Sequence, residues 1–265
     1  IILSNSFSSF GQVLRRTTVY ICTGLAVAIP IKTGAFNMGG EGQVAAGALA
    51  AAVFGSAFAI PLGVHPLVCI LAGMVVGAAL ASIPAFMKIK FGSSDVVTGL
   101  MVNYIVLYVL QYLAQYTFRG SPNSAETAMV FDTAKIARVL QGGQWSYGLF
   151  VAIGLCLLFA FIMNRTRFGL EMKSAGLNSL AARYQGVNVK TMSVVALLIG
   201  GAMASLGGSL EVLGGRYQYL DTYFTNYGYD GIAVAFMARN NPILLIVAAL
   251  IISILTVGAV ALDRQ

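Results

Sequence analysis

The sequence predicts an all-α protein that crosses a membrane several times. Of its 265 residues, 58% are hydrophobic and only 9% are charged, against about 25% charged residues in soluble domains. Its apolar runs are each close to the roughly 20 residues with which a helix crosses a bilayer. A transmembrane β-barrel would need segments of about ten residues that alternate in polarity. The runs here are apolar on all sides, which favours helices.

Eight apolar segments follow one another along the chain. Seven are long runs, and one is too short to span a bilayer alone. In order they are Thr17–Ile31, Val44–Val64, Pro66–Met87, Val96–Phe118, Val139–Asn164, Thr191–Leu210, Gly228–Ala238 and Asn240–Leu262. We therefore expect residues 1–265 to form a single transmembrane domain, with broken or half-spanning helices among the eight segments.

Charged residues predict the orientation of these segments. The connection 164–190 carries five basic residues against one acid, Glu171, and a basic excess in a short loop marks the cytoplasmic side. Counting back from it, the loop 119–144 is extracellular, and Lys88 and Lys90 are cytoplasmic. The same rule explains the net charge of +7 without a nucleic acid partner.

The first third of the chain does not fit this count with two complete spans. Arg15 and Arg16 should be cytoplasmic by charge. Two full spans after them would then place Val64 on the cytoplasmic side, which conflicts with a cytoplasmic Lys88. We therefore expect the shorter segment, Thr17–Ile31, not to cross completely, and a helix to be broken at Gly34–Gly42.

The segment from Asn37 to Gln43 places a carboxylate, two amides and three glycines between two apolar runs. A carboxylate beside membrane-length apolar sequence is costly, so it has a partner, a water-filled cavity or a function. The glycines allow the backbone to bend or to approach another group closely. Glu41 could be an acid in the first turn of a new helix, where a negative charge is favourable. It could also form a polar site on a pathway with Asn37 and Gln43, and the two interpretations are compatible.

Two further patterns concern packing between helices. Asn103 and Gln111 share one helical face, with Tyr104 and Tyr108 close to it. These side chains could form hydrogen bonds between helices, or an amide and aromatic lining for a polar solute that contains a ring. The small residues of Gly200–Gly208 allow close helix packing.

The sequence predicts that the chain is not an enzyme. It contains no Gly-Lys dipeptide and therefore no P-loop, and neither an HExxH motif nor a GxSxG motif. Its three cysteines have no metal-binding spacing. An intramembrane hydrolase would also need a nucleophile with a general base beside it, and the sequence shows no such pair of residues. We expect no catalytic residues, no metal site and no cofactor in this chain.

Four blocks of sequence resemble the permease subunits of ABC importers for branched-chain amino acids, simple sugars and nucleosides. The segment from Thr33 to Gln43 resembles the "aGxFNIGxEGQ" segment of that family. Gly176-x-Asn178-x-x-Ala181-Ala182-x-x-x-Gly186 resembles its coupling-loop signature, and Met101-x-Asn103-Tyr104 and the segment from Gly228 to Ala235 also match. The likeness is greatest to the nucleoside-importer branch. Full members have an additional helix at each end, so the resemblance implies either that terminal helices are missing here or that this protein is shorter than usual.

The resemblance implies a multi-pass subunit of a bacterial inner-membrane importer driven by ATP. ATP and Mg would be bound by a separate cytoplasmic ABC ATPase, an extracellular lipoprotein would deliver the solute, and a second homologous permease would complete a heterodimer. The solute would be small and polar, most like a nucleoside, with a sugar or another small solute as the alternative. A proton-coupled secondary transporter, in which Glu41 titrates, is the rival class.

The resemblance also implies which residues carry this function. The pathway residues would be Asn37, Glu41, Gln43, Asn103 and Tyr104. Coupling to the ATPase would involve Gly176, Asn178, Ala181, Ala182 and Gly186. We expect an Ala182→Arg substitution to abolish this coupling while membrane insertion stays intact.

Overall fold

A computed structural model describes residues 6–58, 60–120, 126–139, 144–220 and 226–262. These ranges are almost entirely helical, and their few β-pairings are isolated bridges. The α-helices are α1 (Ser6–Ile31), α2 (Gly40–Ala57), α3 (Val64–Phe91), α4 (Asp95–Tyr112), α5 (Gly148–Arg165), α6 (Arg167–Leu177), α7 (Ser179–Tyr184), α8 (Val189–Glu211), α9 (Tyr227–Met237) and α10 (Pro242–Leu262). Short π-helical turns, η1 (Leu113–Thr117) and η3 (Val212–Arg216), continue α4 and α8, and a 3-10 turn, η2 (Asp132–Ala134), lies between α4 and α5.

The all-α membrane architecture is confirmed, whereas the exact number of eight apolar segments is not. Five helices in the described ranges are long and apolar enough to cross a membrane: α3, α4 with η1, α5, α8 with η3, and α10. Two helices are shorter than the apolar runs that predicted them. The run Val44–Val64 is helical only to Ala57, and the helix expected over Val139–Asn164 begins at Gly148. Residues 140–143 of that run lie outside the described ranges.

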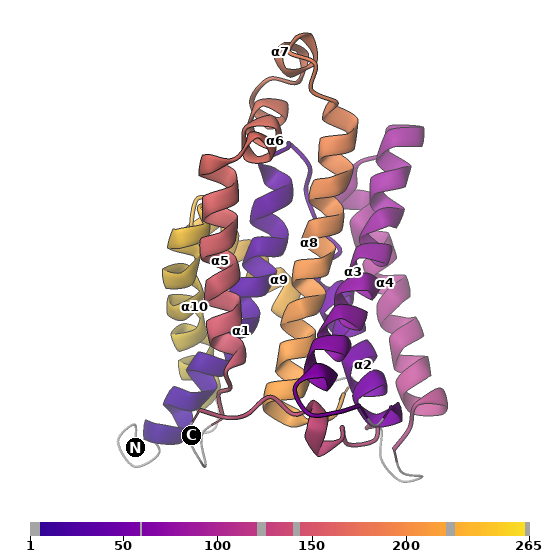
Figure 1. Ribbon diagram of the computed structural model, residues 1–265, viewed down its shortest axis with the longest axis vertical. Coiled ribbons are helices and arrows are strands. Elements are labelled where there is room, and N and C mark those ends of the chain that lie inside the picture. The colour runs from indigo at the N-terminus through magenta and orange to yellow at the C-terminus, as the bar shows by residue number, and fades with distance from the viewer. Residues whose placement is uncertain (1–5, 59, 121–125, 140–143, 221–225, 263–265) are drawn as a thin grey trace.

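The long helices form an elongated bundle around α8, which is the most buried of the five spans. In Figure 1, α3 and α4 lie on one side of α8, and α5 and α10 lie on the other. The helix α8 packs against α1, α2 and α3. At one end of the bundle, α6 and α7 project beyond the other helices, and both chain termini lie at the opposite end (Figure 1). We call these the loop end and the terminal end.

The predicted break between the first two helices is present, because residues 32–39 are not helical. The segment Thr17–Ile31 is the C-terminal part of α1, which has 26 residues and is about 39 Å long at 1.5 Å per residue. The helix α1 is not among the five candidate spans, and an incomplete crossing by this segment stays a prediction. The chain then returns from the loop end, and α2 begins part-way along the bundle (Figure 1). The short helix is therefore α2.

The charge rule misled this part of the prediction because one of the two arginines is neutralised inside the protein. Arg15 Nε pairs with Glu211 Oε1 at 2.9 Å, and Glu211 ends α8 at the terminal end. The two arginines thus lie at the opposite end of the bundle from Lys88. An arginine that is largely covered and paired with a buried acid does not follow the rule for loop charges.

Small residues bring α2 and α8 into close contact, and those of Gly200–Gly208 in α8 were expected to allow close packing. Ser205 Oγ donates to the Gln43 carbonyl at 2.5 Å, and Ser209 Oγ donates to the Gly47 carbonyl at 3.1 Å. A Cβ atom on Gly208 would overlap the Val44 carbonyl. The backbones can approach only because these positions lack large side chains. This contact fixes the start of α2 against the centre of the bundle.

We expect Gly208→Val to destabilise the protein by about 1–3 kcal/mol, because overpacking a tight contact has costs of this order. The measurement is thermal unfolding of the detergent-purified protein. Gly154→Val in α5 is a matched control, since a Cβ there would meet nothing within 4 Å. Equal melting temperatures for the two variants would contradict the close α2–α8 contact.

Candidate functional site

The N-termini of α2 and α9 meet at Glu41, which is 3% exposed. Its Oε1 accepts a hydrogen bond from the backbone N–H of Asn226, and its Oε2 accepts one from Gly228 at 2.6 Å. A Cβ on Gly228 would overlap the backbone of Glu41, so only glycine fits there. Glu41 lies in the first turn of α2, yet its carboxylate caps a different helix. We call this contact the half-helix junction.

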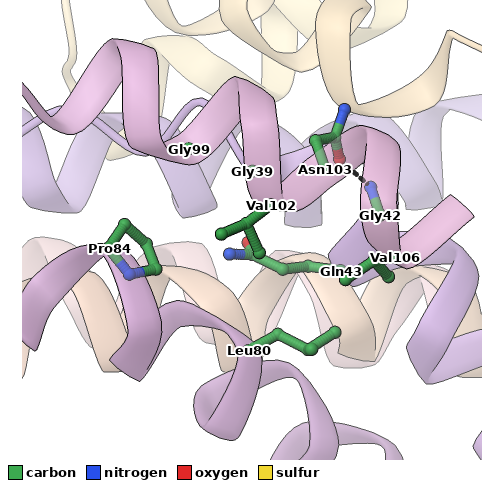
Figure 2. Close-up of a pocket in the computed structure, with 9 residues that line it drawn as sticks. All are labelled: Gly39, Gly42, Gln43, Leu80, Pro84, Gly99, Val102, Asn103 and Val106. Atoms are coloured by element: carbon green, nitrogen blue, oxygen red, sulfur yellow. Dashed lines mark hydrogen bonds between the residues drawn. The ribbon is translucent and has the colours of Figure 1, made fainter. Parts of the chain in front are cut away.

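Asn103 of α4 joins both sides of the half-helix junction. Its Oδ1 accepts from the backbone N–H of Gly42 in the first turn of α2 (Figure 2). Its Nδ2 donates to the Tyr229 hydroxyl of α9 at 2.9 Å. A Cβ on Gly42 would come within 2.8 Å of Asn103 Oδ1. One buried amide therefore satisfies a free N–H at the start of α2 and links three helices.

Asn37 and Gln43 hold the break that precedes α2. Asn37 Nδ2 donates to Gln43 Oε1 at 2.8 Å, and Gln43 Nε2 donates to Asn37 Oδ1 at 3.2 Å. Asn37 Nδ2 also reaches the Ala26 carbonyl of α1 at 3.3 Å. The two amides form a closed pair, which satisfies polar groups that are buried among apolar helices.

A small cavity lies beside these amides. It is lined by Gln43 and Asn103 together with Leu80, Pro84 and Val102 (Figure 2). Its volume is about that required by a single water molecule. A solute with a ring does not fit, so any contact between such a solute and Gln43 would require the helices to separate.

The structure brings four of the five expected pathway residues together. Asn37, Glu41, Gln43 and Asn103 are buried within the half-helix junction and its support. Tyr104 lies next to them on the outer side of α4, where it is exposed. Direct contact between the four buried residues and a solute stays a prediction.

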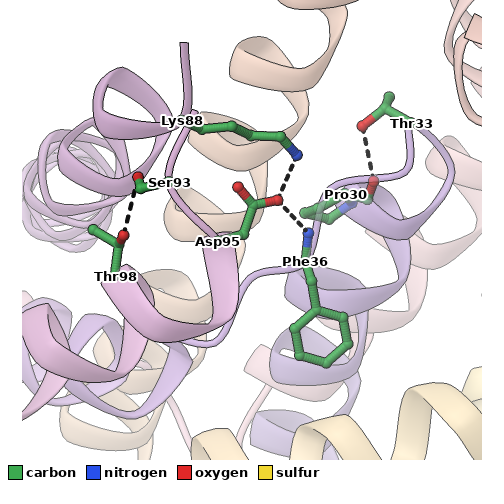
Figure 3. A network of polar contacts seen from close by, with 7 residues as sticks. All are labelled: Pro30, Thr33, Phe36, Lys88, Ser93, Asp95 and Thr98. Atoms are coloured by element: carbon green, nitrogen blue, oxygen red, sulfur yellow. Dashed lines mark hydrogen bonds and ion pairs between the residues drawn. The ribbon is translucent and has the colours of Figure 1, made fainter. Parts of the chain in front are cut away.

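The segment 32–39 is held at two points between the loop end and the half-helix junction. Asp95 Oδ2 accepts from the Phe36 backbone N–H at 3.2 Å and from Lys88 Nζ at 2.5 Å (Figure 3). At the start of the segment, a Cβ on Gly176 would overlap the Lys32 carbonyl, so α6 packs directly on this backbone. A movement of α6 would therefore displace the segment 32–39, which contains Asn37.

The loop end is built by side-chain caps. Thr166 Oγ1 accepts from the Gly169 N–H at 3.2 Å and starts α6. Asn178 Oδ1 accepts from the N–H groups of Leu180 and Ala181 at 3.1 and 3.0 Å and starts α7. Gly186, with φ 83°, ends this turn, a conformation that glycine adopts readily.

The large residues that are exposed at the loop end are not the residues that were expected to couple to the ATPase. Ala182 is only 1% exposed and lies beneath the helix, whereas Ala181 is exposed. Three large apolar side chains at the loop end are exposed. They are Leu177, the last residue of α6, and Leu180 and Tyr184 of α7, which are 87%, 66% and 93% exposed. We call these three residues the apolar tip. Exposed large apolar residues grouped in this way mark interaction sites.

Sequence reasoning missed three residues that hold the site. Asp95 and Lys88 flank a turn and have opposite charges, which is a signal for an ion pair. Asn226, which adopts the left-handed conformation with φ 73°, gave no such signal. Its role depends on a backbone N–H that any residue type could supply.

A bundle of membrane-spanning helices with two half-helices meeting inside it, and a capped helical loop at one end, is the architecture of a transporter's membrane subunit. A solved ABC transporter of the metal-chelate type, in an inward-facing conformation, has the same fold, with a TM-score of 0.52 and 13% identity over 95% of this chain and 78% of that one. Residues 9–264 match the family described as branched-chain amino acid transport system / permease component. The chain belongs to this family of ABC transporter permeases, which are multi-pass transport components of the cell membrane.

Curated relatives cover nearly the whole chain. The guanosine ABC transporter permease NupP of Bacillus subtilis is 31% identical over 94% of this chain and 73% of its own length. NupQ, also a guanosine permease of Bacillus subtilis, is 26% identical over 87% of this chain and 75% of its own length. The glucose permease TsgB13 of Haloferax volcanii is 32% identical over 97% of this chain and 71% of its own length.

Proposed function

We propose that this chain is one of two membrane subunits of an ATP-driven importer that carries a nucleoside into the cell. The observation that carries the ATP-driven mechanism is the apolar tip at the loop end, which offers a partner protein an exposed apolar surface. The similarity to guanosine permeases over most of the chain supports a nucleoside as the solute.

The connection 164–190 is the cytoplasmic coupling loop in this proposal. An ABC ATPase, which binds ATP and Mg, docks on the apolar tip. The basic residues of the loop, and Lys88 and Lys90 at the same end of α3, support a cytoplasmic loop end. The loop 119–144 is then extracellular and faces the solute-binding lipoprotein.

A second permease subunit completes the passage. NupP and NupQ are two guanosine permeases of one organism, and both resemble this chain. This pairing supports a heterodimer of two related permeases.

The proposed site residues divide into two groups. Asn37, Glu41, Gln43 and Asn103 hold the two half-helices behind the passage, and Tyr104 faces it. Gly176, Asn178, Ala181, Ala182 and Gly186 shape the coupling loop and its contact with the segment 32–39. Because Gly176 packs on the Lys32 backbone, closure of the ATPase would reach the half-helix junction through that segment.

Reconstitution tests this proposal. The chain is placed in liposomes with the ATPase, the second permease and the binding lipoprotein, and uptake of radiolabelled guanosine is measured with and without ATP. We expect uptake only with ATP and only when all the subunits are present. Uptake by this chain alone, driven by a proton gradient, would instead establish a secondary transporter.

A sugar is the second candidate solute, because the glucose permease TsgB13 is as similar to this chain as NupP is. Competition in the same vesicles separates the two. Uptake of labelled guanosine should be ATP-dependent and insensitive to excess glucose, and labelled glucose should not be taken up. ATP-dependent uptake of labelled glucose without uptake of guanosine would make the importer a sugar transporter.

A further inference from the structure

Three tyrosines form a stripe along α4. Tyr104, Tyr108 and Tyr112 follow one another at intervals of four residues, which places them on one side of the helix. All three side chains are exposed, and Tyr108 is 72% exposed. Asn103 and Leu110 on the other side of the helix are buried against the bundle. We call Tyr104, Tyr108 and Tyr112 the tyrosine stripe.

The tyrosine stripe is unsuited to lipid. Tyrosines of membrane proteins are enriched at the two interfaces, where the hydroxyl group meets water. Tyr104 and Tyr108 instead lie 9 and 13 residues after the first residue of α4, which is about 14 and 20 Å along the helix. A phenol at that depth needs water or a polar partner, because lipid tails offer no hydrogen bonds.

The helix α10 offers a comparison for the exposed side of α4. Its exposed large residues are all aliphatic, namely Ile243, Leu244, Val247, Leu250, Ile251, Ile254, Leu255, Val260 and Leu262. The exposed side of α4 carries aliphatic residues too, namely Val97, Met101, Ile105 and Val109, but the three tyrosines add hydroxyl groups to it. The tyrosine stripe is therefore the feature that distinguishes this side of α4 from α10.

The tyrosine stripe begins next to the half-helix junction. Tyr104 directly follows Asn103, whose Nδ2 donates to the Tyr229 hydroxyl at 2.9 Å. From there the stripe continues towards the terminal end, where Tyr112 packs on Tyr116 with ring centroids 5.0 Å apart. It thus connects mid-depth with the proposed extracellular end.

We propose that Tyr104, Tyr108 and Tyr112 line the solute passage between this subunit and the second permease, and that a planar heterocycle moves along their rings. The inference rests on the proposed function and adds the surface that recognises the solute. Every nucleobase has a π-face, so each of the bases can stack on an aromatic ring. Repeated weak sites let a solute enter and also leave.

Cysteine labelling tests whether water reaches the tyrosine stripe. The native cysteines, Cys22, Cys69 and Cys156, are all buried. Tyr108→Cys is compared with Leu255→Cys, which lies 13 residues after the start of α10 and is 66% exposed. Both helices run from the loop end to the terminal end (Figure 1), so the two positions have similar depth.

The assembled transporter in liposomes is treated with a charged, membrane-impermeant thiol reagent. We expect Tyr108→Cys to be labelled at least about tenfold faster than Leu255→Cys, because the reactive thiolate forms in water and is suppressed in an apolar environment. Guanosine, supplied with the binding lipoprotein and ATP, should slow labelling at residue 108 only. Equally slow labelling of both cysteines would overturn the proposal. Tyr112→Cys serves as a second test position.

Guanosine uptake by two variants of Tyr108, one that keeps the aromatic ring and one that removes it, provides an independent readout. Tyr108→Phe should keep guanosine uptake within about twofold, since the stacking face remains, and Tyr108→Leu should lower it several-fold. Unchanged uptake in Tyr108→Leu would overturn the ring-recognition proposal. If the wild-type transporter carries no guanosine while residue 108 is still labelled from water, the proposed substrate fails and the passage stands.

Discussion

Glu41→Ala should reduce ATP-driven uptake by at least about tenfold and lower the melting temperature. The substitution leaves the N–H groups of Asn226 and Gly228 without their acceptor inside the bundle. Each buried donor left unsatisfied costs about 1–3 kcal/mol, and 1.4 kcal/mol already changes an equilibrium tenfold. Uptake in the reconstituted transporter and thermal unfolding in detergent measure the two effects.

Glu41→Gln is the informative control for that experiment. A glutamine keeps one acceptor oxygen but presents an amide N–H₂ to the second backbone N–H, so it should restore only part of the stability and activity. A proton-coupled transporter would instead be inactive with Gln and would lose uptake in the presence of a protonophore. Normal uptake by Glu41→Ala would show that the half-helix junction is dispensable.

Leu180→Asp should abolish ATP-driven uptake and the association with the ATPase, while membrane insertion and folding remain intact. Leu180 belongs to the apolar tip and is 66% exposed. A carboxylate there is harmless in the free subunit but would be desolvated on docking without a partner. Copurification with the ATPase, stimulation of ATPase activity and guanosine uptake are the three measurements.

Leu180→Met keeps an apolar side chain of similar size, so it should preserve all three properties.

Ala182→Arg also gives a sharp contrast. Because Ala182 lies on the buried side of α7, we expect this variant to distort the loop itself. The distortion should be visible as increased proteolysis at the loop end. Wild-type copurification and uptake with Leu180→Asp would exclude the apolar tip as the docking surface.

Local sequence predicted the local features of this protein well. The small residues of Gly200–Gly208 predicted a helix surface that packs closely, although not its partner α2, and the polar segment between Asn37 and Gln43 predicted a break in the helix. Such features depend on residues close in sequence, where side-chain size and polarity act directly on the backbone.

Features that join distant parts of the chain could not be predicted. The partners of Glu41 lie 185 and 187 residues away and are backbone N–H groups, which leave no trace in residue type. Arg15 misled the topology because Glu211, its ion-pair partner, is equally distant. The six residues of α7 are too few for a periodic pattern, so the burial of Ala182 was not visible.

The half-helix junction also fixes the electrostatic character of the membrane interior. Each helix N-terminus carries an effective charge of roughly +0.5, so the ends of α2 and α9 together present about one positive charge. When the carboxylate between them is ionised, its negative charge offsets these two partial positive charges. The proposed passage beside the junction then meets little net charge from it, which suits an uncharged solute such as a nucleoside or a sugar.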